Sequence, residues 1–165
     1  MARQSETSEQ LWLLDKQSDL KEHLHNIVLS GQQKVFIFSR ELNGLLFNHQ
    51  QLSQSISRIA RASRFSEVKI VIEKPHALVE SNHHLLKLAQ RLPSKIAIKK
   101  LLIDPQDDYA FVIVDDDKLW LQHREDSNTG FANYDAKPEV KRFKTVFDGL
   151  WRNSQEDSQL RKLAL

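Results

Sequence analysis

The apolar run Tyr109–Asp115 has the residue types of a strand that is buried on both faces. It is rich in β-branched and aromatic residues, too short for an amphipathic helix, and bounded by acidic turns. Lys118–His123 follows as a second extended segment after three consecutive aspartates, which tolerate turn conformations. The pattern therefore predicts a central strand that continues into a hairpin.

Further extended segments alternate with helical patterns along the chain. Strands are predicted at Lys34–Ser39, Glu67–Ile72 and Lys95–Leu102, and a short edge strand at Gly130–Tyr134. Apolar positions at helical spacing predict helices over 19–30, 49–64 and 85–91, and a last helix that begins near Pro138. This order predicts an α/β fold: a layered mixed sheet, with parallel strands plus an antiparallel hairpin, flanked by helices.

The two ends of the chain differ in character from this core. Residues 1–18 are expected to form a flexible N-terminal leader, and residues 19–165 a single domain. Trp12 and the leucine-rich tail Leu160–Leu165 are more apolar than solvated termini need to be. Either these segments cover the domain's own core, or at least one of them mediates self-association or binds a partner.

Composition excludes several classes of protein. The chain of 165 residues has no cysteine, which removes disulfides and thiolate chemistry, and its four glycines are too scattered for a phosphate-binding loop. The formal charge of +2 implies no strong field toward nucleic acid or membrane. No apolar run approaches the ~18 residues of a membrane span. We therefore expect a cytoplasmic domain without cofactor or metal.

Histidines and aspartates supply the first candidates for chemistry. His84 and Lys87 are three residues apart, so on a helix they share a face and could hold a phosphate or act as acid and base. A solvated helical turn is the alternative. Five aspartates flank the buried strand: Asp107, Asp108, Asp115, Asp116 and Asp117. They are interpreted as turn residues, except that Asp115 closes a buried strand, where α/β sheets tend to place ligands.

Ser39 and Arg40 occupy the same kind of position after the first predicted strand. An arginine there could bind phosphate or carboxylate in a fork, or it could pair with Glu41 or with a carboxylate at the end of the sheet. Nucleic acid has a weaker candidate in a set of basic residues that no aromatic RNA-binding motif accompanies. These residues are Arg58, Arg61, Arg64, Lys95, Lys99 and Lys100.

The strand Phe111–Asp115, with its preceding acidic turn, resembles the approach to the catalytic motif of the phospholipase-D-like superfamily. That motif reads His-x-Lys-x-x-x-x-Asp, with the histidine as nucleophile and the lysine on the phosphate. If Asp115 is the motif aspartate, Asp108 stands at the histidine position and Ala110 at the lysine position. If Asp116 is used instead, Tyr109 and Phe111 stand there. The resemblance implies the fold, and neither alignment retains the reactive pair.

More narrowly, the chain resembles a family of uncharacterised proteobacterial domains that keep this fold without its motif and are sometimes fused to an acetyltransferase domain. Four stretches carry the resemblance: Phe38–Leu42, His84–Leu86, Leu92–Ser94 and Ser158–Leu163. The family implies a fold and no established activity.

Two hypotheses follow from the sequence. In the first, the chain is a catalytically silent phospholipase-D-like module that binds or regulates an unknown protein partner, with a homodimer as one form. In the second, it is an enzyme or sensor for phosphate-bearing ligands, such as a nucleotide or nucleic acid, through Ser39, Arg40, His84 and Asp115. Loss of the histidine and lysine favours the first hypothesis.

Overall fold

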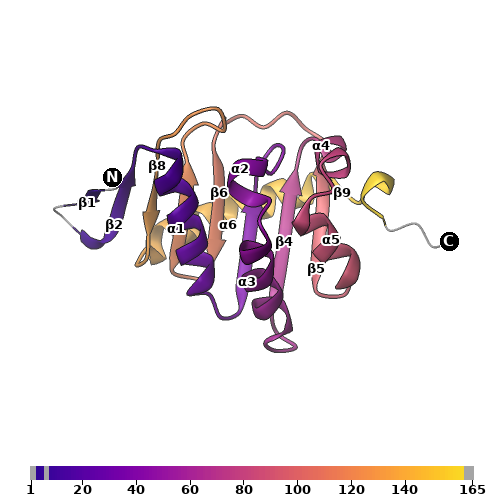
Figure 1. Cartoon of the computed structure of the whole chain (residues 1–165), viewed down its shortest axis with the longest axis horizontal. Coiled ribbons are helices and arrows are strands. Elements are labelled where there is room, and N and C mark those ends of the chain that lie inside the picture. The colour runs from indigo at the N-terminus through magenta and orange to yellow at the C-terminus, as the bar shows by residue number, and fades with distance from the viewer. Residues whose placement is uncertain (1–2, 6–7, 162–165) are drawn as a thin grey trace.

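A computed structural model of the chain describes residues 3–5 and 8–161. In this part of the chain, nine strands form one mixed sheet with helices on both faces (Figure 1). In their order across the sheet, the strands are β1 (Arg3–Ser5), β2 (Ser8–Leu14), β8 (Gly130–Asn133), β7 (Lys118–Gln122), β6 (Ala110–Val114), β3 (Lys34–Phe38), β4 (Glu67–Ile72), β5 (Ile96–Leu101) and β9 (Ser154–Gln155).

The predicted mixture of parallel and antiparallel strands is confirmed. Strands β3, β4 and β5 are parallel neighbours, and β6 and β7 form the antiparallel hairpin. Strand β6 lies in the middle of the sheet, where it pairs antiparallel with β3, and all five of its residues are buried. The two-sided apolar pattern of this segment therefore predicted its central position correctly.

Helices cover the two faces of the sheet unequally. Helix α6 lies behind the sheet in Figure 1, and the other α-helices lie in front of it. The front layer contains α1 (Gln17–Leu29), α2 (Gly44–Phe47), α3 (Gln50–Arg61), α4 (Pro75–Glu80) and α5 (His84–Arg91). The back layer is α6 (Lys137–Arg152), and a short 3-10 helix, η1 (Ser158–Leu160), follows β9.

Alternation along the central strands builds a separate apolar core on each face. In β6, Val112 and Val114 belong to the core under the front helices, whereas Phe111 and Ile113 belong to the core under α6. The back core is aromatic: the rings of Phe111 and Phe143 lie 5.1 Å apart between centroids. Because side chains alternate across a strand, one continuous apolar run supplies both cores.

The N-terminal segment departs from the expected flexible leader. Strand β2 pairs antiparallel with β8, and α1 already begins at Gln17, so residues 8–18 are largely part of the ordered fold. Trp12 packs against the front core, with its ring 5.2 Å from that of His23. Strand β2 pairs with β8, more than a hundred residues away, and with the short polar strand β1, so the local apolar pattern did not indicate it.

This arrangement also corrects the expected edge strand at Gly130–Tyr134. The segment is a strand, β8, but it is interior because β2 covers its outer side. Gly130 sits so close to β7 that an added Cβ would lie 2.1 Å from the carbonyl oxygen of Leu121, so glycine is required there.

At the other end of the chain, Leu160 packs into the front core, as expected for the start of the leucine-rich tail. The amide of Gln90 donates to the carbonyl oxygen of Leu160 at 3.2 Å. Residues 162–165 of that predicted tail lie outside the described residues. Among the described helices, none combines the length and apolar character needed to cross a membrane.

Candidate functional site

Ser39 and Arg40 begin the loop that leaves the carboxyl end of β3. The Ser39 side chain is 1% exposed; its Oγ accepts the Leu42 N–H at 2.9 Å and donates to Oε2 of Glu125 at 3.3 Å. The backbone N–H of Arg40 donates to Oε1 of Glu125 at 2.5 Å. The buried hydroxyl and the carboxylate therefore hold the loop in shape, and Ser39 offers no accessible nucleophile.

The guanidinium of Arg40 lies between two carboxylates. Its Nη1 is 3.3 Å from Glu73, which directly follows β4, and its Nη2 is 3.2 Å from Asp108. The sequence left open whether Arg40 binds a ligand, Glu41 or a carboxylate at the sheet end. The structure pairs it with sheet-end carboxylates, while Glu41 pairs with Lys74 at 3.1 Å.

This edge of the sheet is acidic as a whole. Arg40 faces three carboxylates, those of Glu73, Asp108 and Glu125. Burial raises the pKa of Glu125, although hydrogen bonds from the Arg40 backbone and from Ser39 act in the opposite direction. The carboxylates already in place neutralise the charge of Arg40 and would repel a phosphate that enters here.

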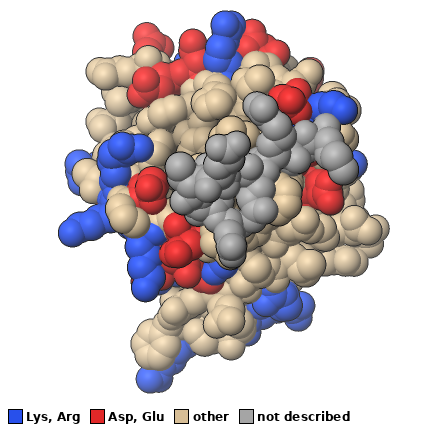
Figure 2. All heavy atoms as spheres, turned by 90° about the vertical axis from the view of Figure 1, so that its left-hand side faces the viewer, with Lys and Arg blue, Asp and Glu red and all other residues tan. Residues whose placement is uncertain are grey.

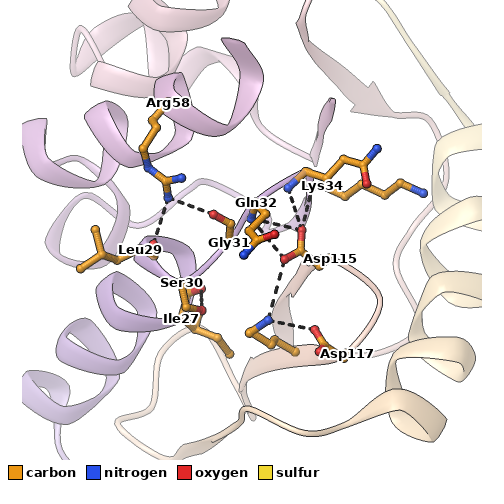
Figure 3. Close-up of polar contacts among 11 residues, drawn as sticks. Ile27, Leu29, Ser30, Gly31, Gln32, Lys34, Arg58, Asp115 and Asp117 are labelled. Atoms are coloured by element: carbon orange, nitrogen blue, oxygen red, sulfur yellow. Dashed lines mark hydrogen bonds and ion pairs between the residues drawn. The ribbon is translucent and has the colours of Figure 1, made fainter. Parts of the chain in front are cut away.

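Asp115 lies at the opposite edge of the sheet from Ser39 and Arg40. Because β6 runs antiparallel to β3, the end of β6 meets the beginning of β3. The Asp115 carboxylate accepts backbone N–H groups of Gln32 at 3.2 Å, Gln33 at 2.9 Å and Lys34 at 3.1 Å (Figure 3). The sequence predicts a ligand position here, but the carboxylate is used within the fold.

Two neighbouring contacts reinforce the Asp115 junction. Lys118 lies 3.8 Å from the Asp115 carboxylate and 3.0 Å from that of Asp117. Arg58 of α3 donates to the carbonyl oxygens of Leu29, at 2.9 Å, and Gly31, at 3.0 Å, at the end of α1 (Figure 3). Helices α1 and α3, the start of β3 and the β6–β7 turn are thus joined at one place.

The adjacent histidines His83 and His84 have different roles. His83 is 1% exposed; its Nδ1 accepts the Leu85 N–H at 3.1 Å, and its Nε2 lies 3.0 Å from the Leu42 carbonyl oxygen, to which it must donate. Burial lowers the pKa of His83 to about 4, despite the bond to Leu42. His83 is therefore a neutral cap of α5. His84 is partly exposed at the first position of that helix.

His84 lies at one end of a groove of about 550 Å³ between α3 and α5. From α3, the groove is lined by Gln50, Ser53, Gln54, Ser57 and Arg61. From α5, it is lined by His84, Lys87, Gln90 and Arg91. The predicted pair of His84 and Lys87 is thus brought together on one helix face. The sequence reasoning missed the α3 stripe and Arg91, although His84, Lys87 and Arg91 stand at helical spacing.

The four predicted site residues consequently do not form one site. Ser39 and Arg40 share the carboxyl edge of the sheet, Asp115 lies at the amino edge of β3, and His84 lies in the helical layer. Among the described residues, no three His, Asp or Glu side chains are arranged to hold a metal ion.

The predicted basic set is likewise divided. Arg58 is used at the end of α1, Arg64 lies over the ring of Phe65, and Lys99 lies 4.4 Å from the ring centroid of Trp151 on α6. Of this set, Arg61 alone lines the groove between α3 and α5.

Residues 16–163 match the model of a family described as a domain of unknown function, DUF7931. The chain belongs to this family. The match spans α1 to the region after η1, so the DUF7931 domain includes both helical layers and all strands except β1 and β2. No curated protein sequence matches the chain.

The fold of this DUF7931 domain is that of phospholipase D family members. Nuc from Salmonella typhimurium has a TM-score of 0.60 at 12% identity, over 84% of this chain and 89% of that one. NucT from Helicobacter pylori has a TM-score of 0.58 at 18% identity, over 89% and 97%. At such identities, the likeness shows the fold alone.

A third structure with this fold is TrmBL2, described as an archaeal chromatin protein with a novel mode of DNA binding. Its TM-score is 0.66 at 13% identity, over 93% of this chain. The DUF7931 chain spans 56% of the length of TrmBL2.

Replacing Asp115 tests its role in the fold. Asp115→Ala removes the acceptor for three backbone N–H groups, so the free energy of unfolding should fall by about 2–3 kcal/mol. The exposed Asp116 is the matched control, and Asp116→Ala should stay within about 0.5 kcal/mol of the wild type. Urea denaturation measures both variants, and equal effects would contradict a structural role for Asp115.

His83 predicts a dependence of stability on pH. Because its pKa is about 4 in the folded chain and higher when unfolded, the unfolded chain binds more protons between those values. Neutral His83 therefore contributes roughly 3 kcal/mol to the free energy of unfolding above pH ~6.5, and this contribution is lost as the pH falls toward 4.

The variant His83→Asn keeps an acceptor for the helix cap but does not titrate in this range. The difference in unfolding free energy between wild type and variant should therefore shrink as the pH is lowered from 7 to 4.5, as measured by urea denaturation. A difference that stays constant over this range would show that His83 is not buried as a neutral group.

Proposed function

We propose that this domain is a phospholipase-D-like module of the bacterial cytoplasm that acts by binding and does not cleave phosphodiesters. One observation carries the proposal: the arginine at the carboxyl edge of the sheet is already paired with Glu73 and Asp108. Because these carboxylates neutralise the arginine, this end of the sheet does not attract a phosphate. Its buried Ser39 hydroxyl is also not accessible as a nucleophile.

The residues at the resembled motif positions support the same conclusion. Asp108 stands where the motif has its nucleophilic histidine, and its carboxylate is in an ion pair with Arg40. Ala110 stands where the motif has its lysine, and it is fully buried in β6. The alternative placement uses Tyr109 and Phe111, which pack in the aromatic core under α6. Neither placement provides an imidazole or a cation.

An enzyme or sensor that combines Ser39, Arg40, His84 and Asp115 has less support. These residues lie in three separate places, and two of them, Ser39 and Asp115, accept backbone N–H groups within the fold. Binding of a phosphate-bearing ligand without chemistry fits the domain better. The fold likeness to a chromatin protein described as DNA-binding is consistent with such a ligand.

Self-association remains a prediction. Trp12, which the sequence offered as an interface residue, packs on the domain's own core, as does Leu160. Trp12 and Leu160 therefore give self-association less support, while residues 162–165 of the predicted tail lie outside the described residues.

The proposal predicts no turnover of a generic phosphodiester such as bis(p-nitrophenyl) phosphate. Purified wild-type protein should release no more p-nitrophenol than a buffer blank, with or without Mg²⁺, because Asp108 and Ala110 supply neither the imidazole nor the cation of the resembled motif. Absorbance over several hours measures the release.

Robust turnover that disappears in His84→Ala would contradict the proposal, because it would identify a relocated nucleophile. Turnover that survives in His84→Ala but disappears in Asp108→Ala would contradict it as well, by placing chemistry at the sheet edge.

A further inference from the structure

The groove between α3 and α5 is built from two stripes of long polar side chains. On α3, Gln50, Gln54, Ser57 and Arg61 recur at intervals of three or four residues and so share one face. On α5, Lys87 and Arg91 do the same. Both helices connect parallel strands, so they run in the same direction and their last residues, Arg61 and Arg91, lie at the same end of the groove.

The charge of the groove has one sign. Arg61, Lys87 and Arg91 line it together with amides, hydroxyls and one imidazole, and no carboxylate is among the lining residues. All three cations are exposed, and none forms an ion pair with a described carboxylate.

The rest of the molecule is different. The chain has 24 Lys and Arg against 22 Asp and Glu, and without the three groove cations this becomes 21 against 22. At the end of the sheet that carries β1 and β2, acidic and basic side chains lie side by side (Figure 2). The groove, with three cations and no carboxylate among its lining residues, is a local excess of positive charge that can attract an anion.

We propose that this groove binds the phosphodiester backbone of a nucleic acid. The proposal rests on the function proposed above, binding without cleavage, and adds the site and the class of ligand. The cations engage phosphate oxygens, and the amide groups of Gln50 and Gln54 and the hydroxyl of Ser57 can donate hydrogen bonds to the same oxygens.

The lining favours nucleic acid over a protein or a membrane. Protein interfaces have an apolar centre, and a bound amphipathic helix needs apolar anchors, whereas every residue that lines this groove is polar or charged. Protein–nucleic acid interfaces are more polar and more positively charged. Amphipathic helices that lie on membranes bury apolar side chains at the acyl boundary, and the groove presents none among its lining residues.

The groove should bind without preference for sequence. No Phe, Tyr or Trp side chain lines it, so it offers no row of aromatic rings on which successive bases could stack. Helix α5, at eight residues, is about 12 Å long and so presents its cations to only a few phosphates. Binding should therefore depend on the backbone charge and on the salt concentration.

The number of cations predicts the size of the salt effect. With three phosphates neutralised, the slope of log K against log salt should be about −3 for a duplex and about −2 for a single strand. Affinity should then fall roughly 20- to 40-fold between 50 and 200 mM salt.

Fluorescence anisotropy of a labelled 20-nucleotide strand and of its duplex, titrated with the full chain at several salt concentrations, tests the site. The triple variant Arg61→Gln/Lys87→Gln/Arg91→Gln should lose affinity at least about tenfold at 50 mM salt, and its salt slope should approach zero. The matched control is Lys137→Gln/Lys141→Gln/Arg142→Gln, which removes the same charge from exposed positions on α6, behind the sheet. This control should bind within about twofold of the wild type.

Every alternative outcome has a defined meaning. The inference is overturned if the wild type does not bind at 50 mM salt, if both triple variants lose affinity equally, or if poly-glutamate competes as well as an unlabelled strand. A charge-conserving variant, Arg61→Lys/Lys87→Arg/Arg91→Lys, should bind like the wild type, and melting curves confirm that each variant is folded. A gel that shows whether the strand stays intact tests the proposed absence of cleavage separately. Cleavage of the strand would refute binding without cleavage, even where the groove variant abolishes binding.

Discussion

The carboxylate of Asp115 joins the antiparallel hairpin of β6 and β7 to β3, the first of the parallel strands. It accepts the backbone N–H groups of Gln32, Gln33 and Lys34, so the end of β6 is held against the start of β3. Asp115 itself has a φ of 56°, a left-handed conformation that aspartate tolerates better than most residues and that turns the chain into β7. The junction therefore sets both the register of the central pair and the direction of the hairpin.

The polar groups at the two ends of β3 therefore have different partners. The end of the sheet with Asp115 joins α1, α3 and the hairpin turn, and its polar groups are used within the fold. At the opposite end, where parallel α/β sheets usually bind ligands, Arg40 is paired with carboxylates from two other segments. With both ends committed in this way, the groove between α3 and α5 is where cationic side chains remain available to a ligand.

The same pairing is consistent with the proposed function, binding without cleavage. Catalysis on a phosphodiester needs a nucleophile and a cation beside the same phosphate. Here the cations that could attract phosphate lie on α5 and at the end of α3, whereas the buried hydroxyl of Ser39 lies at the end of β3. A phosphate held by Lys87 or Arg91 would meet amides, hydroxyls and His84, but no nucleophile activated by a neighbouring base.

Most of the core of the fold could be predicted from the sequence, because it follows from local patterns. The two-sided apolar run gave β6 its central position, and the helical stripes located α1, α3, α5 and α6. Strand β2 could not be predicted in this way, since its start is polar and its partners are the short β1 and the distant β8. The same limit applies to the interior position of β8.

The candidate site was harder to predict, for a related reason. Asp115 was singled out because it closes a buried strand, but the antiparallel pairing of β6 with β3 places it at the end of the sheet opposite to Ser39 and Arg40. Arg40 was correctly placed, and its pairing with a sheet-end carboxylate was one of the stated alternatives. The groove forms only where α3 and α5 lie side by side. The spacing of His84 and Lys87 indicated the wall from α5, but nothing in the sequence showed that α3 lies opposite.

We propose that the domain binds phosphate-bearing ligands in its helical layer and not at the carboxyl end of β3. Backbone ¹H–¹⁵N NMR spectra of the full chain, titrated with a short unlabelled oligonucleotide, distinguish the two places. Perturbed signals should cluster on α3 and α5, from Gln50 to Arg61 and from His84 to Arg91, while Ser39, Arg40 and Glu125 stay unchanged. Perturbations centred on Ser39, Arg40 and Glu125, with α3 and α5 unaffected, would contradict it.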